Sequence, residues 1–173
     1  MVDYDGIRTI VVQGLEKYLN CPVIRSNQNA DIRLILEKEE NERIYPYVVY
    51  TVTTIASENK GTWGEYADGK DRKPVTQTWS VTAISDNNTE SVMLANKARE
   101  WLDRVGTVYL SDNGIVVQSV GSITNRDNFL TVEYEYINGF DAFLWLYDEI
   151  DSEAINAGYG YIETASFEHK ALT

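Results

Sequence analysis

Residues 75–83 read Val-Thr-Gln-Thr-Trp-Ser-Val-Thr-Ala, and this stretch decides the fold class. Large, mostly apolar side chains alternate with threonine and serine, which is the two-residue period of a strand with one buried face. A helical pattern follows, with apolar positions at Leu94, Ala95, Ala98, Trp101, Leu102 and Val105. Asn87 and Glu90 fit a capping box at its start, and we expect Gly106 to end it at the C′ position. A strand followed directly by a helix is therefore the central unit.

A second amphipathic helix is predicted over residues 5–19, nearer the N-terminus. Its apolar positions recur every three or four residues, at Ile7, Ile10, Val11, Leu15, Tyr18 and Leu19. Asp3 or Asp5 is the expected N-cap, and Asn20 with Pro22 should stop the helix. Gly14, in the middle, indicates a place where another element packs closely.

Further strands are predicted over residues 45–55, 115–124, 129–137 and 140–147. Asn138-Gly139 is the strongest short hairpin-turn pattern in the chain, and residues 140–147 are apolar enough to be buried on both faces. Helix, strands, helix and strands in this order predict an α+β fold, a mostly antiparallel sheet with two packed helices. We expect one domain over residues 1–150 and a C-terminal extension over 151–173 with at most one strand.

Two segments are less regular. Residues 23–44 favour an extended hairpin arm over a short helix, with Ile32, Leu34 and Leu36 as candidate contact residues for a partner. Residues 57–73 form a predicted polar loop that carries Trp63 and Tyr66. Large aromatic side chains are costly to leave in water, so we expect this loop to order against a neighbouring subunit or another protein.

The composition limits the possible functions. Among 173 residues, 27 are acidic and 15 basic, giving a formal charge of −12, which argues against nucleic-acid binding as the primary function. The single cysteine, Cys21, cannot form an internal disulfide, and no apolar run approaches the length of a membrane span. The acidic N-terminus lacks the features of a signal peptide. We therefore expect synthesis and assembly in a cytoplasm.

Catalytic and metal-binding patterns are not supported. The single histidine, His169, lies near the C-terminus, so a Ser-His-Asp triad has no well-placed base, and Cys21 has no local activating partner. One cysteine and one histidine do not make a zinc site, and the acidic cluster at residues 148–151 lacks the calcium-loop pattern. Glu133 and Glu135 share one strand face, but a solvent or subunit face explains them better than paired catalytic carboxylates. The sequence predicts no enzyme, no cofactor and no metal.

Short patches in a fixed order resemble the tail-terminator (neck-terminator) proteins of long-tailed bacteriophages. They cover residues 4 to 147 and include Tyr4-Asp-Gly-Ile-Arg8, Gly14-Leu15, Tyr18-Leu19, Pro22-Val-Ile24, Asn27-Gln28, Tyr45-Pro-Tyr47, Thr53-Thr54, Gly61-Thr-Trp63, Gln77-Thr-Trp-Ser80, Ser85-Asp86, Glu90-Ser91, Trp101-Leu102, Val117-Gln118, Ile123-Thr-Asn-Arg-Asp-Asn128, Glu133-Tyr-Glu-Tyr136 and Gly139-Phe-Asp141. The order and spacing of the patches carry the resemblance.

The resemblance implies a structural virion protein with no catalytic residues. Its subunits would close into a homohexameric ring that caps the tail-tube protein, ends tail polymerisation and offers the head-tail joining face to the connector or stopper protein. DNA would only pass through the lumen, for which Glu133, Glu135, Asp148 and Glu149 are candidate wall acids. The alternative is that these acids only keep the outer surface of the protein soluble. The alternatives are another ring protein of the neck or tail, such as a head-completion or tail-tube subunit, and a small non-enzymatic prophage-encoded adaptor.

Overall fold

The computed structural model describes residues 2–26, 31–58, 65–67, 69–127 and 135–151, with the backbone alone at 65–67 and 151. One sheet runs through the molecule in the order β1 (Val23–Arg25), β2 (Tyr47–Glu58), β4 (Lys70–Ser85), β7 (Tyr136–Asp151) and β5 (Val116–Val120). Two short strands extend it: β3 (Glu65–Ala67) pairs with β4, and β6 (Thr124–Asn125) pairs with β7. Every pair is antiparallel except β1 with β2, which confirms the predicted sheet.

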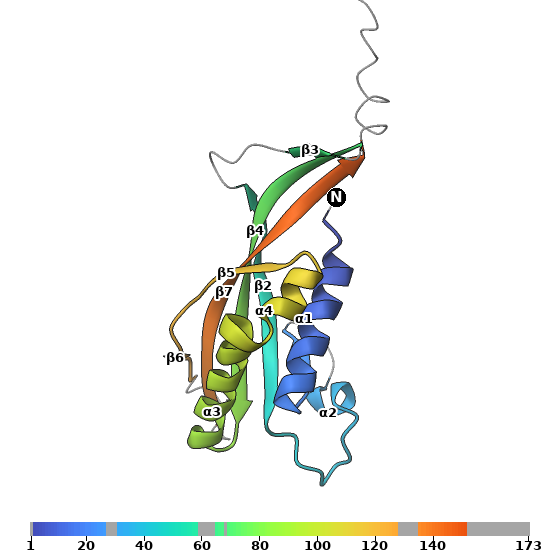
Figure 1. Cartoon of the computed structure of the whole chain (residues 1–173). Coiled ribbons are helices and arrows are strands. Elements are labelled where there is room, and N and C mark those ends of the chain that lie inside the picture. The colour runs from blue at the N-terminus through green and yellow to red at the C-terminus, as the bar shows by residue number, and fades with distance from the viewer. Residues whose placement is uncertain (1, 27–30, 59–64, 68, 128–134, 152–173) are drawn as a thin grey trace, which may run out of the picture.

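The helices form a layer on one face of this sheet (Figure 1). The layer contains α1 (Tyr4–Leu19), α3 (Asn88–Glu100) and α4 (Thr107–Asp112), and a π-helical turn, η1 (Trp101–Val105), joins α3 to α4. A one-turn helix, α2 (Ile32–Ile35), lies beside α1. The α+β fold class is therefore confirmed.

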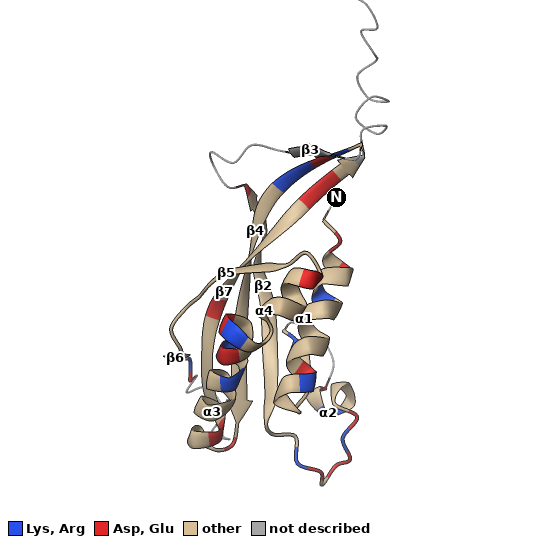
Figure 2. Ribbon diagram, in the orientation of Figure 1, with Lys and Arg blue, Asp and Glu red and all other residues tan. Residues whose placement is uncertain are grey.

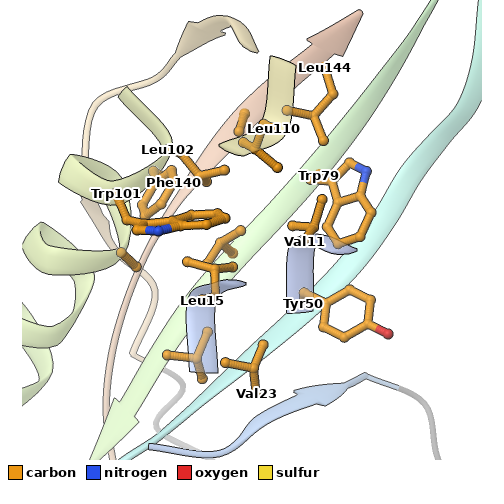
Figure 3. Packing of buried hydrophobic residues seen from close by; sticks show 14 of the residues in the cluster. Val11, Leu15, Val23, Tyr50, Trp79, Trp101, Leu102, Leu110, Phe140 and Leu144 are labelled. Carbon is orange, nitrogen blue, oxygen red and sulfur yellow. The ribbon is translucent and has the colours of Figure 1, made fainter. Parts of the chain in front are cut away.

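The core lies between the helical layer and the sheet (Figure 3). Val11 and Leu15 of α1 and Leu102 of η1 are buried against Trp79 and Phe140 of the two central strands. The predicted alternation of β4 is confirmed, since the inward side chains at Val75, Gln77, Trp79, Val81 and Ala83 are all buried.

Gln77 is buried because it has a specific partner. The indole N–H of Trp79 donates a hydrogen bond to the side-chain carbonyl of Gln77 at 2.9 Å. A buried indole N–H without an acceptor would be costly, and Gln77 supplies this acceptor from the same strand. Trp79 also stacks on Tyr50 of β2, with ring centroids 5.1 Å apart.

The predicted N-caps are confirmed, but the predicted capping box of Asn87 and Glu90 is wrong. Asp3 caps α1 by accepting a hydrogen bond from the Gly6 N–H at 2.9 Å, and Asn20 takes the left-handed conformation at its end. The Asn87 side chain accepts from the N–H groups of Thr89 and Glu90 at the start of α3. The Asn87 N–H donates to Ser85 Oγ at 3.1 Å, and the Glu90 carboxylate accepts from Ser85 Oγ and Arg43 instead.

The predicted C′ role of Gly106 is wrong. Its φ is −86°, and the chain continues through η1 into α4 instead of leaving the helical layer. Gly106 is needed for packing, because a Cβ there would lie 2.5 Å from Cε2 of Trp101.

The predicted hairpin turn at Asn138-Gly139 is also wrong, since both residues lie inside β7, opposite Ala83 and Thr82. Packing explains this pair: a Cβ on Gly139 would lie 2.7 Å from the carbonyl oxygen of Val81, and the buried Asn138 amide donates to Ser91 Oγ at 3.0 Å.

Residues 140–147 are buried on one face and not on both. Phe140, Ala142, Leu144 and Leu146 point into the core, but Phe143 and Tyr147 are 37% and 51% exposed. These two lie on the face of the sheet that α1, α3 and α4 leave uncovered.

The preferred hairpin arm over residues 23–44 is wrong, and the short helix is the correct alternative. Residues 23–25 form β1, parallel to β2, and Asp31 caps α2 by accepting from the Arg33 N–H at 2.9 Å. The Arg33 guanidinium donates to the carbonyls of Glu39 and Glu42, so the following segment folds back onto α2 instead of forming a strand.

The predicted loop over residues 57–73 is largely strand where the structure describes it. β2 continues to Glu58, β3 covers Glu65–Ala67, and β4 already begins at Lys70. Residues 59–64 and 68 lie outside the described part of the chain, as do 128–134 of the strand expected over 129–137 and the extension over 152–173.

Candidate functional site: polar junctions and exposed surfaces

Polar side chains join neighbouring elements at three places. At the first, Arg126 follows β6 and lies across the helix-free face of β4 and β7. Its guanidinium donates to Ser80 Oγ at 2.6 Å and Thr82 Oγ1 at 3.2 Å, and pairs with Asp141 at 3.0 Å. A Cβ on Gly139 would lie 3.0 Å from the same guanidinium, so the glycine leaves room for the arginine.

The second junction ties the segment after α2 to the start of α3. Arg43 pairs with Glu90 at 2.7 Å and with Asp86 at 3.1 Å. Ser85 Oγ donates to Glu90 and accepts from the Asn87 N–H, so the turn between β4 and α3 is bonded on both sides.

The third junction lies beside the start of β2. The Tyr45 hydroxyl donates a hydrogen bond to Glu135, and the Tyr45 ring stacks on Tyr47 at 5.7 Å. Burial, together with the negative charge of Glu135, raises the pKa of Tyr47 above its ordinary value. A neutral phenol here fits an aromatic packing role.

The junctions unite sequence patches that are far apart in the chain. Gln77-Thr-Trp-Ser80, Ile123 to Asn128 and Gly139-Phe-Asp141 meet at Arg126, whereas Tyr45-Pro-Tyr47 meets Glu135. Gly14 meets Trp101 across the helical layer. These patches hold the fold together. The residue patterns did not predict the role of Arg126, because its partners Ser80 and Asp141 lie 46 and 15 residues away in the chain.

The described residues contain no group of His, Cys, Asp and Glu side chains that could hold a metal ion. Burial, assisted by the charge of Glu16, raises the pKa of the Cys21 thiol to about 11, which leaves it a poor nucleophile. No described helix is both long and apolar enough to cross a membrane.

Among the candidate contact residues, Leu34 stands out. It is 76% exposed at α2, whereas Ile32 and Leu36 on either side are half-buried. Tyr66 lies in β3, where its backbone pairs with Asp71, and Trp63 lies outside the described residues. Partner contact by Trp63 and Tyr66 remains a prediction.

The candidate wall acids do not form one cluster. Glu135 directly precedes β7 and Glu149 lies near its end, about 45 Å apart at ~3.3 Å per strand residue. Glu149 pairs with Lys70 at 3.1 Å and Arg72 at 2.8 Å, and the hydrogen bond from Lys70 is the main reason that its carboxyl pKa is lowered. Asp148 lies next to it on β7, and Glu133 is outside the described residues.

The ends of β4 and β7 project beyond the helical layer and carry these charges (Figures 1 and 2). We call residues 70–74 and 147–151, with β3, the β-arm. Lys73 also pairs with Glu58 of β2 at 2.7 Å, so ion pairs bridge three strands at its base. The β-arm keeps Tyr147 and Ile150 exposed, at 51% and 45%. The two-layer fold therefore has a projecting arm and exposed apolar side chains on several surfaces.

Comparison with known protein families shows to which class of protein the chain belongs. A sequence model described as phage neck terminator protein matches residues 4–168, so the chain belongs to the phage neck terminator protein family. This confirms the resemblance noted from the short patches and makes the chain a structural protein of the phage neck. No curated protein matches the chain.

Proposed function

We propose that copies of this chain close into a ring on the end of the phage tail tube. The ring stops further polymerisation of the tube protein and presents the face to which the head connector or stopper joins. The observation that carries this proposal is the family match over residues 4–168, which spans nearly the whole chain. Six copies are the expected number.

The distribution of exposed apolar residues supports ring formation. A ring contact is heterologous, so one surface of each subunit must fit a different surface of the next. The chain offers separate exposed groups: Leu34 on α2, Val105 of η1 with Val108 of α4, and Phe143 with Tyr147 on the helix-free sheet face. Contacts with the neighbouring subunits, the tube and the connector would cover these groups in the assembled neck.

The charge supports transit of DNA without binding. Each chain carries −12, so six copies would carry 6 × (−12) = −72. We place Glu133, Glu135, Asp148 and Glu149 as candidate residues of the lumen wall. Lys70 and Arg72 pair with Glu149 and offset its negative charge. Among the described residues, Glu135 is therefore the stronger candidate for an acidic lumen wall.

The test is to remove the gene from the phage and supply the chain in trans as the control. Without a terminator, tubes should grow past their normal length and fail to join heads, and the supplied chain should restore both properties. Loss of all tubes would instead identify a tube subunit, and full heads that leak DNA beside normal tails would identify a head-completion protein. Normal particles without the chain would favour the adaptor alternative.

A further inference from the structure

The most exposed large apolar side chain on the described surface lies in an acidic setting. Leu34 is 76% exposed on α2, and Glu37, just beyond the end of this helix, is also exposed and donates its N–H to the Leu34 carbonyl at 3.3 Å. Segment 31–43 holds five acids and three bases, a net charge of 3 − 5 = −2. Lys38 is paired with Glu42, and Arg43 is paired with Asp86 and Glu90. Among the described residues, Glu37 makes no ion pair, and neither do Asp31, Glu39 and Glu40.

The opposite side of α1 carries a groove of complementary character. Its volume is about 550 Å³, and it is lined by Gln13, Gly14, Lys17, Tyr18, Trp101 and Tyr109. Because Gly14 has no side chain, the floor reaches the indole of Trp101, and the rings of Tyr18 and Tyr109 line the groove beside it. Val105 and Val108 continue the apolar surface, at 52% and 70% exposed.

Lys17 is the charged residue of this groove and is itself exposed. It makes no ion pair with any described residue, whereas the Glu100 carboxylate accepts a hydrogen bond from the Tyr18 hydroxyl of the groove at 3.5 Å. An aromatic groove with a free ammonium group would accept an apolar side chain that has a carboxylate beside it.

We propose that the groove of one subunit receives the α2 tip of the next copy of this chain, with Leu34 in the groove and Glu37 beside Lys17. In Figure 1, α2 lies on one side of α1 and α4 on the other, and the groove is lined by residues of α1, η1 and α4. The tip and the groove are therefore different surfaces, so the contact is heterologous, the kind that closes a ring when the rotation between subunits permits it. A self-complementary dimer would instead need both surfaces on one face. This inference rests on the proposed ring and names the surfaces that close it.

The first test is a charge exchange in tails assembled in cells that supply the variant chain. Lys17→Glu is expected to lower ring occupancy at the tail end by about tenfold or more, because it places two carboxylates together. Lys17→Glu with Glu37→Lys should restore it. Lys97→Glu, on an exposed lysine of α3 outside the groove, is the matched control and should leave occupancy unchanged. Leu34→Ser should lower occupancy while the purified chain keeps its unfolding midpoint, since Leu34 is a surface residue.

The second test places cysteines at the two proposed partners, as Lys17→Cys with Glu37→Cys in a Cys21→Ala background. A short bis-maleimide should join neighbouring subunits on tails into a ladder of linked chains that ends at the ring size, and neither single-cysteine variant should give a ladder.

Rings that form normally in all variants, with no ladder from the double-cysteine chain, would overturn the inference and leave the proposed function intact. Absence of any ring of the unaltered chain on tails would overturn the proposed function itself.

Discussion

Replacing Gly14 by alanine adds one methyl group to α1 where this helix crosses the indole ring of Trp101. On an exposed helix surface the change would stabilise the protein by about 1 kcal/mol, because glycine is a poor helix former. Here the new Cβ would lie 2.4 Å from Cζ2 and 2.6 Å from Cη2 of Trp101. The helix propensity and the packing therefore act in opposite directions.

The steric cost of the added methyl group should exceed the gain in helix propensity. Trp101 is only 5% exposed, and Gly106 also stands so close that a Cβ there would be 2.5 Å from the ring. The indole is closely packed on the backbone at both glycines, so the cost should lie at the upper end of the ~1–3 kcal/mol typical of overpacking. After the gain in helix propensity, Gly14→Ala should lower the free energy of unfolding by about 1–2 kcal/mol.

Urea denaturation of the purified chain measures this difference, and a double-mutant cycle assigns its cause. Trp101→Phe removes the two ring atoms that the new methyl would strike. In that background Gly14→Ala should be neutral or stabilising, so the sign of its effect should change. Gln13→Ala, on an exposed residue of the same helix, is the control and should change stability by less than about 0.5 kcal/mol. An equal cost in both backgrounds, or a stabilising effect in the native background, would refute the packing argument.

Further outcomes can be measured on the same chain. Arg126→Gln should lower the free energy of unfolding by about 1–3 kcal/mol, because the charged hydrogen bonds to Ser80, Thr82 and Asp141 are lost, whereas Arg104→Gln, at a side chain 78% exposed, should have little effect. Cys21, with its pKa raised from 9.0 to about 11, should react with Ellman's reagent at pH 8 about a hundredfold more slowly in the folded chain than in urea. The same shift predicts that stability falls between pH 9 and 11, since the unfolded thiol loses its proton first; a stability that rises over this range would contradict it. In an assembled ring the lumen-facing side chains should be neutral or acidic, so that the wall repels DNA within a Debye length of ~10 Å; a wall dominated by lysine and arginine would contradict the sliding role.

The sequence was sufficient to predict an element where the spacing of its apolar residues directly indicates which side chains are buried. The alternation in β4 and the spacing of Val11 and Leu15 in α1 describe one-sided burial, and both elements formed as predicted. Caps were equally local, because Asp3 and Asn87 bond to backbone groups two or three residues away.

Predictions failed where a distant partner decided the outcome. Asn138-Gly139 suits a tight turn in isolation, but Gly139 is required by the approach of Val81 and Arg126, and Asn138 by Ser91. Gly106 likewise serves Trp101 and not a helix end. In the candidate site, the sequence indicated Leu34 as a candidate contact residue. It did not predict the groove, because the residues that line the groove come from three elements, α1, η1 and α4.

The most direct measurement of the central claim is a three-dimensional reconstruction of the tail end and neck of the assembled phage. We expect one closed ring of this chain, six subunits around the axis, seated on the last ring of tube protein and in contact with the connector side. Repeated stacked rings of the chain along the tail, or a neck without any ring of it, would contradict the proposed terminator function.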